Sequence, residues 1–277
     1  MTARYAVIGH PIAHSKSPGI HAAFARQTGE AIAYEALHAE LDGFETEVER
    51  FRAAGGCGLN VTVPFKHRAF KLAQHKGARA EQAGAVNTLR FDAAGVFGDM
   101  TDGVGLVRDL TCNIGYAIRG KRVLLLGAGG ASYGVCGALL EEEPAALIVV
   151  NRTAEHARLL VEHFGSLFPV ATLAMGAYGE SADTDFDLVI NATSAGLSGD
   201  MPLLRSGVFA VGALAYDMTY GQTTPFLERA RSEGAQIADG IGMLVEQAAE
   251  SFNIWRGIRP ETTPVIALLR GEANHER

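Results

Sequence analysis

A glycine turn follows a continuous apolar run in the segment VLLLGAGGASYG. The apolar run predicts a buried strand that ends at Gly127, and Gly129 and Gly130 allow a helix to begin close to it. The amide hydrogens and the dipole at such a helix start favour a pyrophosphate group. The strict third glycine of the dinucleotide fingerprint is Ser132 here, so a tight turn without a ligand stays open as the alternative.

The end of the next predicted strand carries Asn151, Arg152 and Thr153. An NAD-binding fold presents a carboxylate to the ribose 2′-hydroxyl at this place, about two dozen residues after the glycine turn. An arginine can instead bind a 2′-phosphate through two hydrogen bonds. The sequence therefore favours NADP over NAD, unless Arg152 is an ordinary solvated arginine.

A second chemical pattern is LNVTVPFK, residues 59–66. Its alternation places Asn60 and Thr62 on one face of a predicted strand. We expect Pro64 to occupy the first turn of a short helix, with Lys66 at the positive end of the helix dipole. A polar strand face is usually only the hydrated face, so these residue types alone do not identify a site.

Composition restricts the class of protein. The chain has 277 residues, of which 48% are hydrophobic and 20% charged, as in a well-cored protein of one large or two ordinary domains. No apolar run is long enough for a membrane helix and no signal peptide is recognisable, so we expect a cytoplasmic protein without a membrane partner. The net charge of −7 and the lack of a basic run argue against nucleic acid as a partner.

Cysteines and histidines give no sign of a metal site. Cys57, Cys112 and Cys136 are far apart and form no C-x-x-C pair, which predicts apolar fillers rather than a disulfide framework or zinc ligands. The nine histidines lack H-x-x-x-H or similar spacing, so no metal is expected.

The order of the predicted elements indicates two α/β domains. Short strand-like runs alternate with helical patterns up to residue 99, and continuous apolar strands separated by helices then predict a parallel sheet buried on both faces. Two C-terminal helical patterns have no strands of their own and are expected to return to the first domain. We predict an N-terminal α/β substrate domain of residues 1–102 and 241–277, and a Rossmann-like domain of residues 103–240.

Several motifs together carry a family resemblance. The chain resembles the shikimate dehydrogenase family, in the same order, at GHPIAHSKSP, NVTVPFK, GAVNTL, DMTDGVG, GAGGAS, NRT, NATSAG, YDMTYG and DGIGMLVEQAAESFNIWRG. The likeness covers nearly the whole chain. It implies an NADP-dependent oxidoreductase of aromatic amino-acid biosynthesis, a monomer or homodimer, that interconverts shikimate and 3-dehydroshikimate.

The resemblance implies roles for two residues in the reaction. Lys66 matches the family's catalytic lysine and Asp102 its aspartate partner, so that the two would hold the reacting hydroxyl while hydride moves. In the reductive direction a lysinium would also stabilise the developing alkoxide. A structural Lys–Asp pair is the alternative.

Further matches imply a substrate pocket. The hydroxyls of Ser15, Ser17 and Tyr220 would hold the substrate carboxylate, and without the resemblance the two serines would be caps for a helix beginning at Pro18. The remaining substrate-binding positions implied by the resemblance are Asn60, Thr62, Asn87, Asp102 and Gln247.

The cofactor positions follow from the same matching. They are Gly127, Ala128, Gly129, Gly130, Ala131, Asn151, Arg152, Thr153, His156, Met218 and Gly240. Met218 and Gly240 would face the nicotinamide, or be core and turn residues. The chain departs from the family at Met100, where asparagine is usual, at Tyr133, where arginine is usual, and at His156, where lysine or arginine is usual. A paralogue that uses quinate or NAD, and a non-catalytic NADP-binding sensor, therefore stay open as alternatives.

Overall fold

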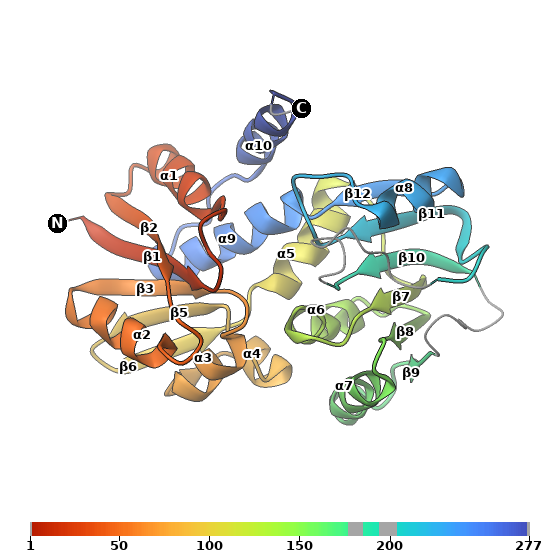
Figure 1. Cartoon of the computed structure of the whole chain (residues 1–277), viewed down its shortest axis with the longest axis horizontal. Coiled ribbons are helices and arrows are strands. Elements are labelled where there is room, and N and C mark those ends of the chain that lie inside the picture. Colours follow the sequence, from red (N-terminus) through yellow and green to blue (C-terminus); the bar gives the residue numbers. More distant parts are fainter. Residues whose placement is uncertain (1, 177–184, 194–203, 276–277) are drawn as a thin grey trace. The chain divides into compact units, whose positions relative to one another are not determined.

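The computed structural model describes residues 2–176, 185–193 and 204–275. The chain forms two compact units, of which the first comprises Met1–Gly105 with Val245–Leu268 and the second Leu106–Leu244 with Leu269–Arg277. Figure 1 shows a sheet flanked by helices in each unit. The α/β fold class predicted from the sequence is confirmed.

The first unit is built on a mixed six-stranded sheet of order β2-β1-β3-β5-β6-β4. Its strands are β1 (Ala3–Gly9), β2 (Ile32–His38), β3 (Gly56–Val61), β4 (His75–Lys76), β5 (Thr88–Asp92) and β6 (Gly95–Asp99). β1 runs parallel to β2 and β3, whereas β5 runs antiparallel to β3 and β6. The ends of β3 and β6 therefore bring residues near 60 and 100 to the same part of the sheet.

Helices cover both faces of this sheet (Figure 1). They are α1 (Ser17–Thr28), α2 (Phe44–Ala53), α3 (Lys66–Leu72), α4 (Ala78–Ala83) and, from the C-terminal region, α9 (Ile241–Arg256). On one face Phe44 and Phe65 pack with Ile8 and Leu59 in one apolar cluster. On the other face Trp255 of α9 stacks on Tyr5 of β1, and its indole nitrogen donates to the Leu89 carbonyl at 2.9 Å. Of the two C-terminal helices predicted to return to the first domain, α9 belongs to the first unit from Val245 onward, and its first four residues belong to the second.

The second unit is built on a parallel sheet of order β12-β11-β10-β7-β8-β9. Its strands are β7 (Arg122–Leu126), β8 (Ala146–Val150), β9 (Leu173–Met175), β10 (Phe186–Asn191), β11 (Phe209–Asp217) and β12 (Gln236–Asp239). The strand order reverses between β7 and β10, as in a dinucleotide-binding fold, and ligands of such sheets bind beyond the carboxyl ends of the strands at this point.

Two apolar layers enclose this parallel sheet. Its helices are α5 (Asp102–Arg108), followed by a π-helical turn (Asp109–Asn113), α6 (Gly130–Glu141), α7 (Ala154–Leu167) and α8 (Pro225–Ser232). Leu125 of β7 belongs to the layer under α6 and α7, whereas Leu124 belongs to the layer under α8. Burial on both faces explains why β7 reads as an uninterrupted apolar run. The last helix, α10 (Thr263–His275), contributes residues to both compact units.

The segment between β3 and α3 differs from its sequence prediction. Pro64 lies in the turn before α3 and not in its first turn, because α3 begins at Lys66. Val63 lies beyond the end of β3 and is 58% exposed, so the strand is shorter than its alternation predicts.

All three cysteines are free, but only Cys136 is buried as a filler; Cys112 is exposed. In the described part of the chain no helix is both long and apolar enough to cross a membrane.

Candidate active site

A lysine and an aspartate form an ion pair in the first unit. Lys66 is the first residue of α3 and Asp102 the first of α5, and the lysine Nζ contacts Oδ2 of the carboxylate. Their side chains are only 14% and 9% exposed, respectively. An ion pair with so little solvent can hold a proton-transferring group at a defined place. The structure thus brings together the two residues predicted to carry the chemistry.

Asn87 holds the other oxygen of this carboxylate. Its Nδ2 donates to Oδ1 of Asp102 at 2.6 Å and to Oγ1 of Thr101 at 2.9 Å. Its Oδ1 accepts from the Thr101 amide at 2.8 Å and from the Thr88 hydroxyl at 3.0 Å. Gln247 of α9 also joins the group, with its Oε1 3.4 Å from Nδ2 of Asn87. Four residues predicted to bind substrate or act on it therefore converge.

Met100 does not weaken this arrangement. The side chain is 2% exposed and packs with Ala83 and Ala85 in a small apolar cluster. The hydrogen bond from Asn87 supports Asp102 instead. Thr101 and Thr88, which orient Asn87, were not predicted as site residues, and only their positions beside Asp102 and Asn87 in the sequence could have pointed to them.

Asn60 has a different environment from the one predicted. It is 6% exposed, and its Oδ1 accepts from the Tyr34 hydroxyl at 2.8 Å. Its Nδ2 lies within hydrogen-bonding distance of Ser251 Oγ at 2.9 Å, Thr88 Oγ1 at 3.2 Å and the Asn87 carbonyl at 3.3 Å. Both ends of the amide therefore have partners inside the protein, which link Asn60 of β3 to β2, β5 and α9. Its predicted contact with a substrate stays a prediction.

The two serines of the predicted pocket follow β1: Ser15 lies in the loop and Ser17 is the first residue of α1. Ser15 Oγ accepts from the Ser17 amide at 3.3 Å. The helix α1 begins at Ser17 rather than at Pro18, and its N-cap position is Lys16, so neither serine is the N-cap. A Cβ added to Gly9 would lie 2.5 Å from Cγ2 of Thr62. Because only glycine fits there, the start of the serine loop packs directly against Thr62 at the end of β3.

The glycine turn of the second unit has the geometry expected for a dinucleotide. Gly127 has a φ of 105° and would meet Thr193 and Ala192 if it had a Cβ, so glycine is required between the ends of β7 and β10. In contrast, a Cβ added to Gly129, which precedes α6, would meet no atom of the described residues within 4 Å. Open space therefore faces the first amides of α6, whose positive dipole end suits a pyrophosphate. Ala128 lies in this turn, and Gly130 and Ala131 are the first two residues of α6.

The segment after β8 lies beside this turn. Oδ1 of Asn151 accepts from the Ala128 amide at 3.2 Å, and its Nδ2 donates to the Thr153 carbonyl at 2.8 Å. Arg152 and His156 are exposed, and Arg152 has no ion-pair partner among the described residues. An exposed guanidinium without a partner fits the binding of a phosphate. Tyr133 packs its ring against His163 and Phe164 of α7 instead of supplying a charge.

Met218 and Gly240 are neighbours at the carboxyl ends of β11 and β12. A Cβ added to Gly240 would lie 2.3 Å from the Met218 carbonyl oxygen, so these two segments touch through their backbones.

Tyr220 is half-buried, and burial raises the pKa of its phenol, which keeps the hydroxyl protonated as a donor. Ser15 and Ser17 belong to the first unit and Tyr220 to the second. The motif NATSAG, residues 191–196, lies partly outside the described residues.

Fold and site together define a class of protein. The parallel sheet with a glycine turn at its reversal point fits a pyrophosphate, and the exposed Arg152 fits a 2′-phosphate. The Lys66–Asp102 pair supplies groups for proton transfer. These features are those of a dinucleotide-dependent oxidoreductase.

Comparison with known proteins gives the family. Residues 7–89 match the shikimate dehydrogenase substrate-binding domain, residues 109–198 match shikimate/quinate 5-dehydrogenase, and residues 240–270 match the C-terminal domain of shikimate 5′-dehydrogenase. The chain belongs to the shikimate dehydrogenase family, and the resemblance seen in the sequence is confirmed.

Relatives and a solved structure agree over nearly the full length. The shikimate dehydrogenase (NADP(+)) of Dechloromonas aromatica is 58% identical over 98% of this chain and 99% of its own. That of Nitrosospira multiformis is also 58% identical, over 98% of each chain. The shikimate 5-dehydrogenase of Thermus thermophilus, solved in complex with NADP(H) and shikimate, is 32% identical with a TM-score of 0.87, covering 98% of this chain and 100% of its own.

Proposed function

We propose that the protein interconverts shikimate and 3-dehydroshikimate with NADP, as its named relatives indicate. The observation that carries this proposal is the nearly dry Lys66–Asp102 pair, whose aspartate is held by Asn87. Gln247 and Thr101, which both contact the Asn87 amide, add further polar side chains to this group. Lys66 lies within residues 7–89, which match the family's substrate-binding domain, and this supports the same function.

In the oxidation of shikimate, the reacting hydroxyl would lie against Lys66 Nζ and Asp102. This pair takes up the hydroxyl proton as the carbon–oxygen bond becomes a carbonyl. Bound NADP would supply the acceptor for the hydride that leaves the same carbon. In the reverse direction the lysine ammonium stabilises the alkoxide and returns the proton. Protons and electrons balance, because one hydride and one proton leave the alcohol.

The remaining residues have proposed roles in binding. Ser15, Ser17 and Tyr220 hold the substrate carboxylate, and Thr62, Asn87 and Gln247 contact the ring hydroxyls. We further propose that residues 1–102 and 241–277 make the substrate contacts, Tyr220 being the exception, and that residues 103–240 hold the cofactor. Two compact units with similar bounds support this division, although residues 241–244 and 269–277 belong to the second unit.

The dinucleotide would be held by the glycine turn and the segment after β8. The amides around Gly129 and Gly130 face the pyrophosphate, and Arg152, with His156 on α7, faces the 2′-phosphate. Met218 and Gly240 would adjoin the nicotinamide.

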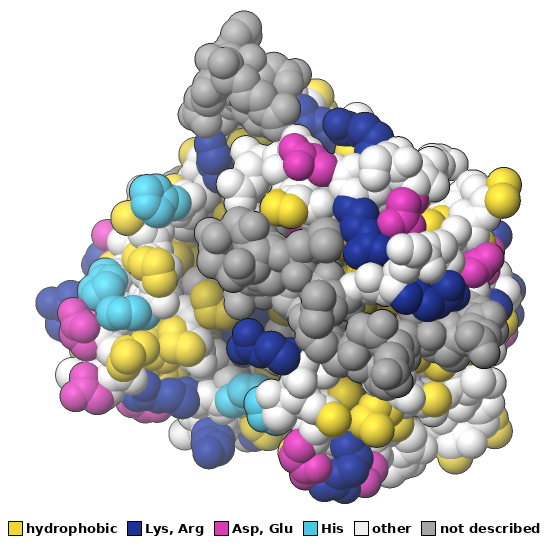
Figure 2. Space-filling view, turned by 45° about the vertical axis from the view of Figure 1, so that its right-hand side comes forward, with side chains coloured by type: hydrophobic (Ala, Val, Ile, Leu, Met, Phe, Trp, Pro, Cys, Tyr) yellow, Lys and Arg dark blue, Asp and Glu magenta, His cyan; other side chains and the backbone are white. Residues whose placement is uncertain are grey.

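A cytoplasmic location is supported by three free thiols. Figure 2 shows basic and acidic side chains interspersed on the face it presents, which fits small-molecule partners rather than a nucleic acid. We propose a monomer or homodimer, which analytical ultracentrifugation would distinguish.

Replacement of Lys66 tests the catalytic assignment. Lys66→Ala should lower kcat for shikimate by roughly 10²–10⁴ and change KM much less, because proton transfer is lost while the pocket is kept. Lys71→Ala is the matched control, since Lys71 is an exposed lysine on the same helix and should leave kcat unchanged. Near-normal turnover of a folded Lys66→Ala protein would remove this residue from the mechanism.

A second candidate is a paralogue that oxidises quinate or uses NAD, since the matching family model covers both shikimate and quinate enzymes. Initial rates with the four pairs of shikimate or quinate and NADP or NAD distinguish the two. The highest kcat/KM should be found for shikimate with NADP. No turnover with any pair would indicate the remaining alternative, a non-catalytic NADP-binding sensor.

A further inference from the structure

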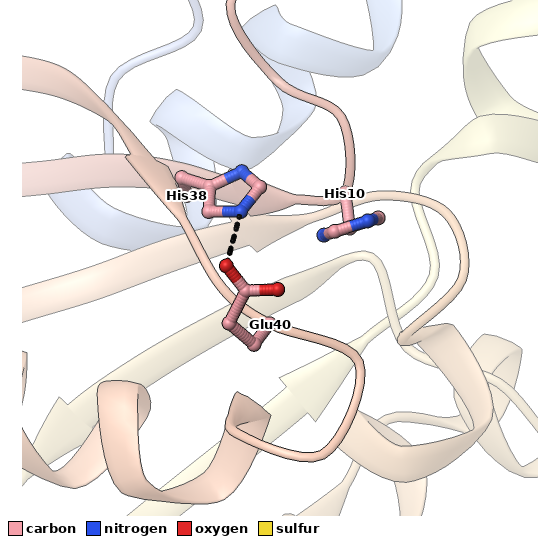
Figure 3. Close-up of side chains that lie close together, drawn as sticks. All are labelled: His10, His38 and Glu40. Atoms are coloured by element: carbon pink, nitrogen blue, oxygen red, sulfur yellow. Dashed lines mark hydrogen bonds and ion pairs between the residues drawn. The ribbon is translucent and has the colours of Figure 1, made fainter.

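Two histidines and a glutamate meet at one end of the first sheet, and none of the three has a role in the site described above. His10 follows β1, His38 ends β2, and Glu40 lies two residues beyond β2. One ring nitrogen from each histidine and one carboxylate oxygen all lie within 4.8 Å of one another. Figure 3 shows the Glu40 carboxylate between the two rings, with a contact to His38. Nothing in the proposed reaction uses these three side chains.

We propose that this histidine–histidine–glutamate cluster is a binding site for a divalent transition-metal ion, such as Zn²⁺. Two imidazoles and one carboxylate are an established ligand set for zinc, with water in the remaining position. The same donors also suit other first-row dications, whereas Mg²⁺ and Ca²⁺ prefer oxygen ligands alone.

The backbone holds the ligands in position. β1 and β2 pair in parallel with Gly9 opposite His38, and the Ala39 amide donates to the Gly9 carbonyl at 3.3 Å. On the side of β1 away from β2, the His10 amide donates to the Val63 carbonyl at 3.1 Å. Strand pairing thus places His10 beside residues that are 28 and 30 positions away in the sequence. This explains why histidine spacing in the sequence gave no sign of a site.

The side chains show features expected around a metal. Nδ1 of His10 lies 3.0 Å from the Ala39 carbonyl oxygen, and a contact of this kind orients metal-binding imidazoles. Nε2 of His38 lies 3.2 Å from Oε1 of Glu40. The two rings are 4.8 Å apart between centroids.

Only a small movement is needed to bind an ion. Ligand atoms around a tetrahedral zinc at about 2.0–2.1 Å are roughly 3.4 Å from one another. Here the ligand atoms lie within 4.8 Å of one another, and His38 Nε2 is already 3.2 Å from Glu40 Oε1. The side chains of His38 and Glu40 are 51% and 73% exposed, so they can rotate to close this gap without disturbing the core. An ion bound there would link the loop that leads to Ser15 with the end of β2.

Zinc titration of the full, untagged chain tests the proposal. Isothermal titration with Zn²⁺ should detect one site that is weakened about tenfold or more in both His38→Gln and Glu40→Gln. His75→Gln is the matched control, because His75 is also an exposed histidine of this unit with a ring nitrogen near a backbone carbonyl, that of Ala94 at 3.2 Å. All these variants keep the three cysteines, and His75→Gln should bind Zn²⁺ as the unaltered protein does.

Cobalt supplies a second measurement that does not depend on heat changes. Co²⁺ added to the unaltered chain should produce the visible absorption of a four- or five-coordinate ion, and His38→Gln should lose this band while retaining its far-ultraviolet circular dichroism. Equal Zn²⁺ affinity in the unaltered chain, His38→Gln and Glu40→Gln would overturn the proposal. Absence of saturable Zn²⁺ binding in the unaltered chain would do the same.

Discussion

His21 makes the stability of the first unit dependent on pH. Its side chain is fully buried in α1, stacked at 4.1 Å on Tyr34 and 5.4 Å from the Trp255 ring. Neither ring nitrogen has a hydrogen-bond partner that meets normal geometry among the described residues. Burial lowers the pKa of His21 to about 3, and the neighbouring Asn60 side chain opposes this shift only in part. The ring is therefore neutral in the folded protein at every ordinary pH.

The direction of the effect follows from proton linkage. In the unfolded chain a histidine has a pKa of about 6.5, so between pH 6.5 and pH 3 the unfolded state binds a proton that the folded state excludes. The free energy of unfolding therefore falls as the pH is lowered through this window. The titration of His21 lowers the free energy of unfolding by about 2 kcal/mol from pH 8 to pH 5. The total loss approaches about 5 kcal/mol below pH 3.

Urea unfolding measures this contribution directly. Trp255 is the only tryptophan of the chain and belongs to the same unit as His21, so its fluorescence reports on the relevant structure. His21→Phe removes the titrating group, and His75→Gln serves as a control at an exposed histidine. Between pH 8 and pH 5, His21→Phe should lose about 2 kcal/mol less stability than the unaltered protein.

The proteins are compared by the change in their free energy of unfolding between pH 8 and pH 5, and not by its absolute value. A larger ring at position 21 can strain the core, but this cost is present at both pH values and cancels. The titration of carboxylates is likewise common to all three proteins. If the unaltered protein and His21→Phe lose the same stability between pH 8 and pH 5, the buried ring is not neutral and the reasoning fails.

Three further predictions concern the cofactor region and α9. Arg152→Gln should weaken NADP binding by roughly 10–100-fold, since a charge-assisted hydrogen bond is lost, and leave NAD binding unchanged; equal loss for both dinucleotides in fluorescence titrations would contradict the phosphate role. Gly240→Ala should lower the melting temperature because its Cβ would meet a carbonyl oxygen at 2.3 Å, whereas Gly129→Ala, facing open space, should preserve the melting temperature and weaken NADP binding. Glu246 is buried and paired with Arg259 at 2.6 Å, so Glu246→Ala should cost about 2–3 kcal/mol in urea unfolding, and an unchanged midpoint would refute this estimate.

Features that depend on neighbouring residues were predictable from the sequence. The strand, glycine turn and helix around Gly127 are found as expected, because an apolar run, a residue with positive φ and a helix start are local signals. The family, and with it the pairing of Lys66 with Asp102, could be predicted because the matching motifs are themselves short segments.

Features that depend on distant contacts were not predictable. Asn60 is buried because Tyr34 and Ser251, 26 and 191 residues away, take up its amide. The support for Asp102 comes from Asn87 rather than from position 100, and nothing in the sequence around Met100 shows this. A single sequence gives the types of residues but not which polar atoms saturate one another after folding.

The two oxygens of Asp102 are no longer chemically equivalent. Oδ1 accepts from Asn87 at 2.6 Å, whereas Oδ2 contacts the ammonium of Lys66. A carboxylate fixed at both oxygens cannot rotate to follow a ligand, so a hydroxyl can donate to it only from the directions that remain free. We therefore expect the enzyme to distinguish epimers at the reacting carbon: the alcohol with the inverted configuration would direct its hydrogen rather than its oxygen toward the pair. Stereochemical selection would then be a property of the resting protein, present before any cofactor binds.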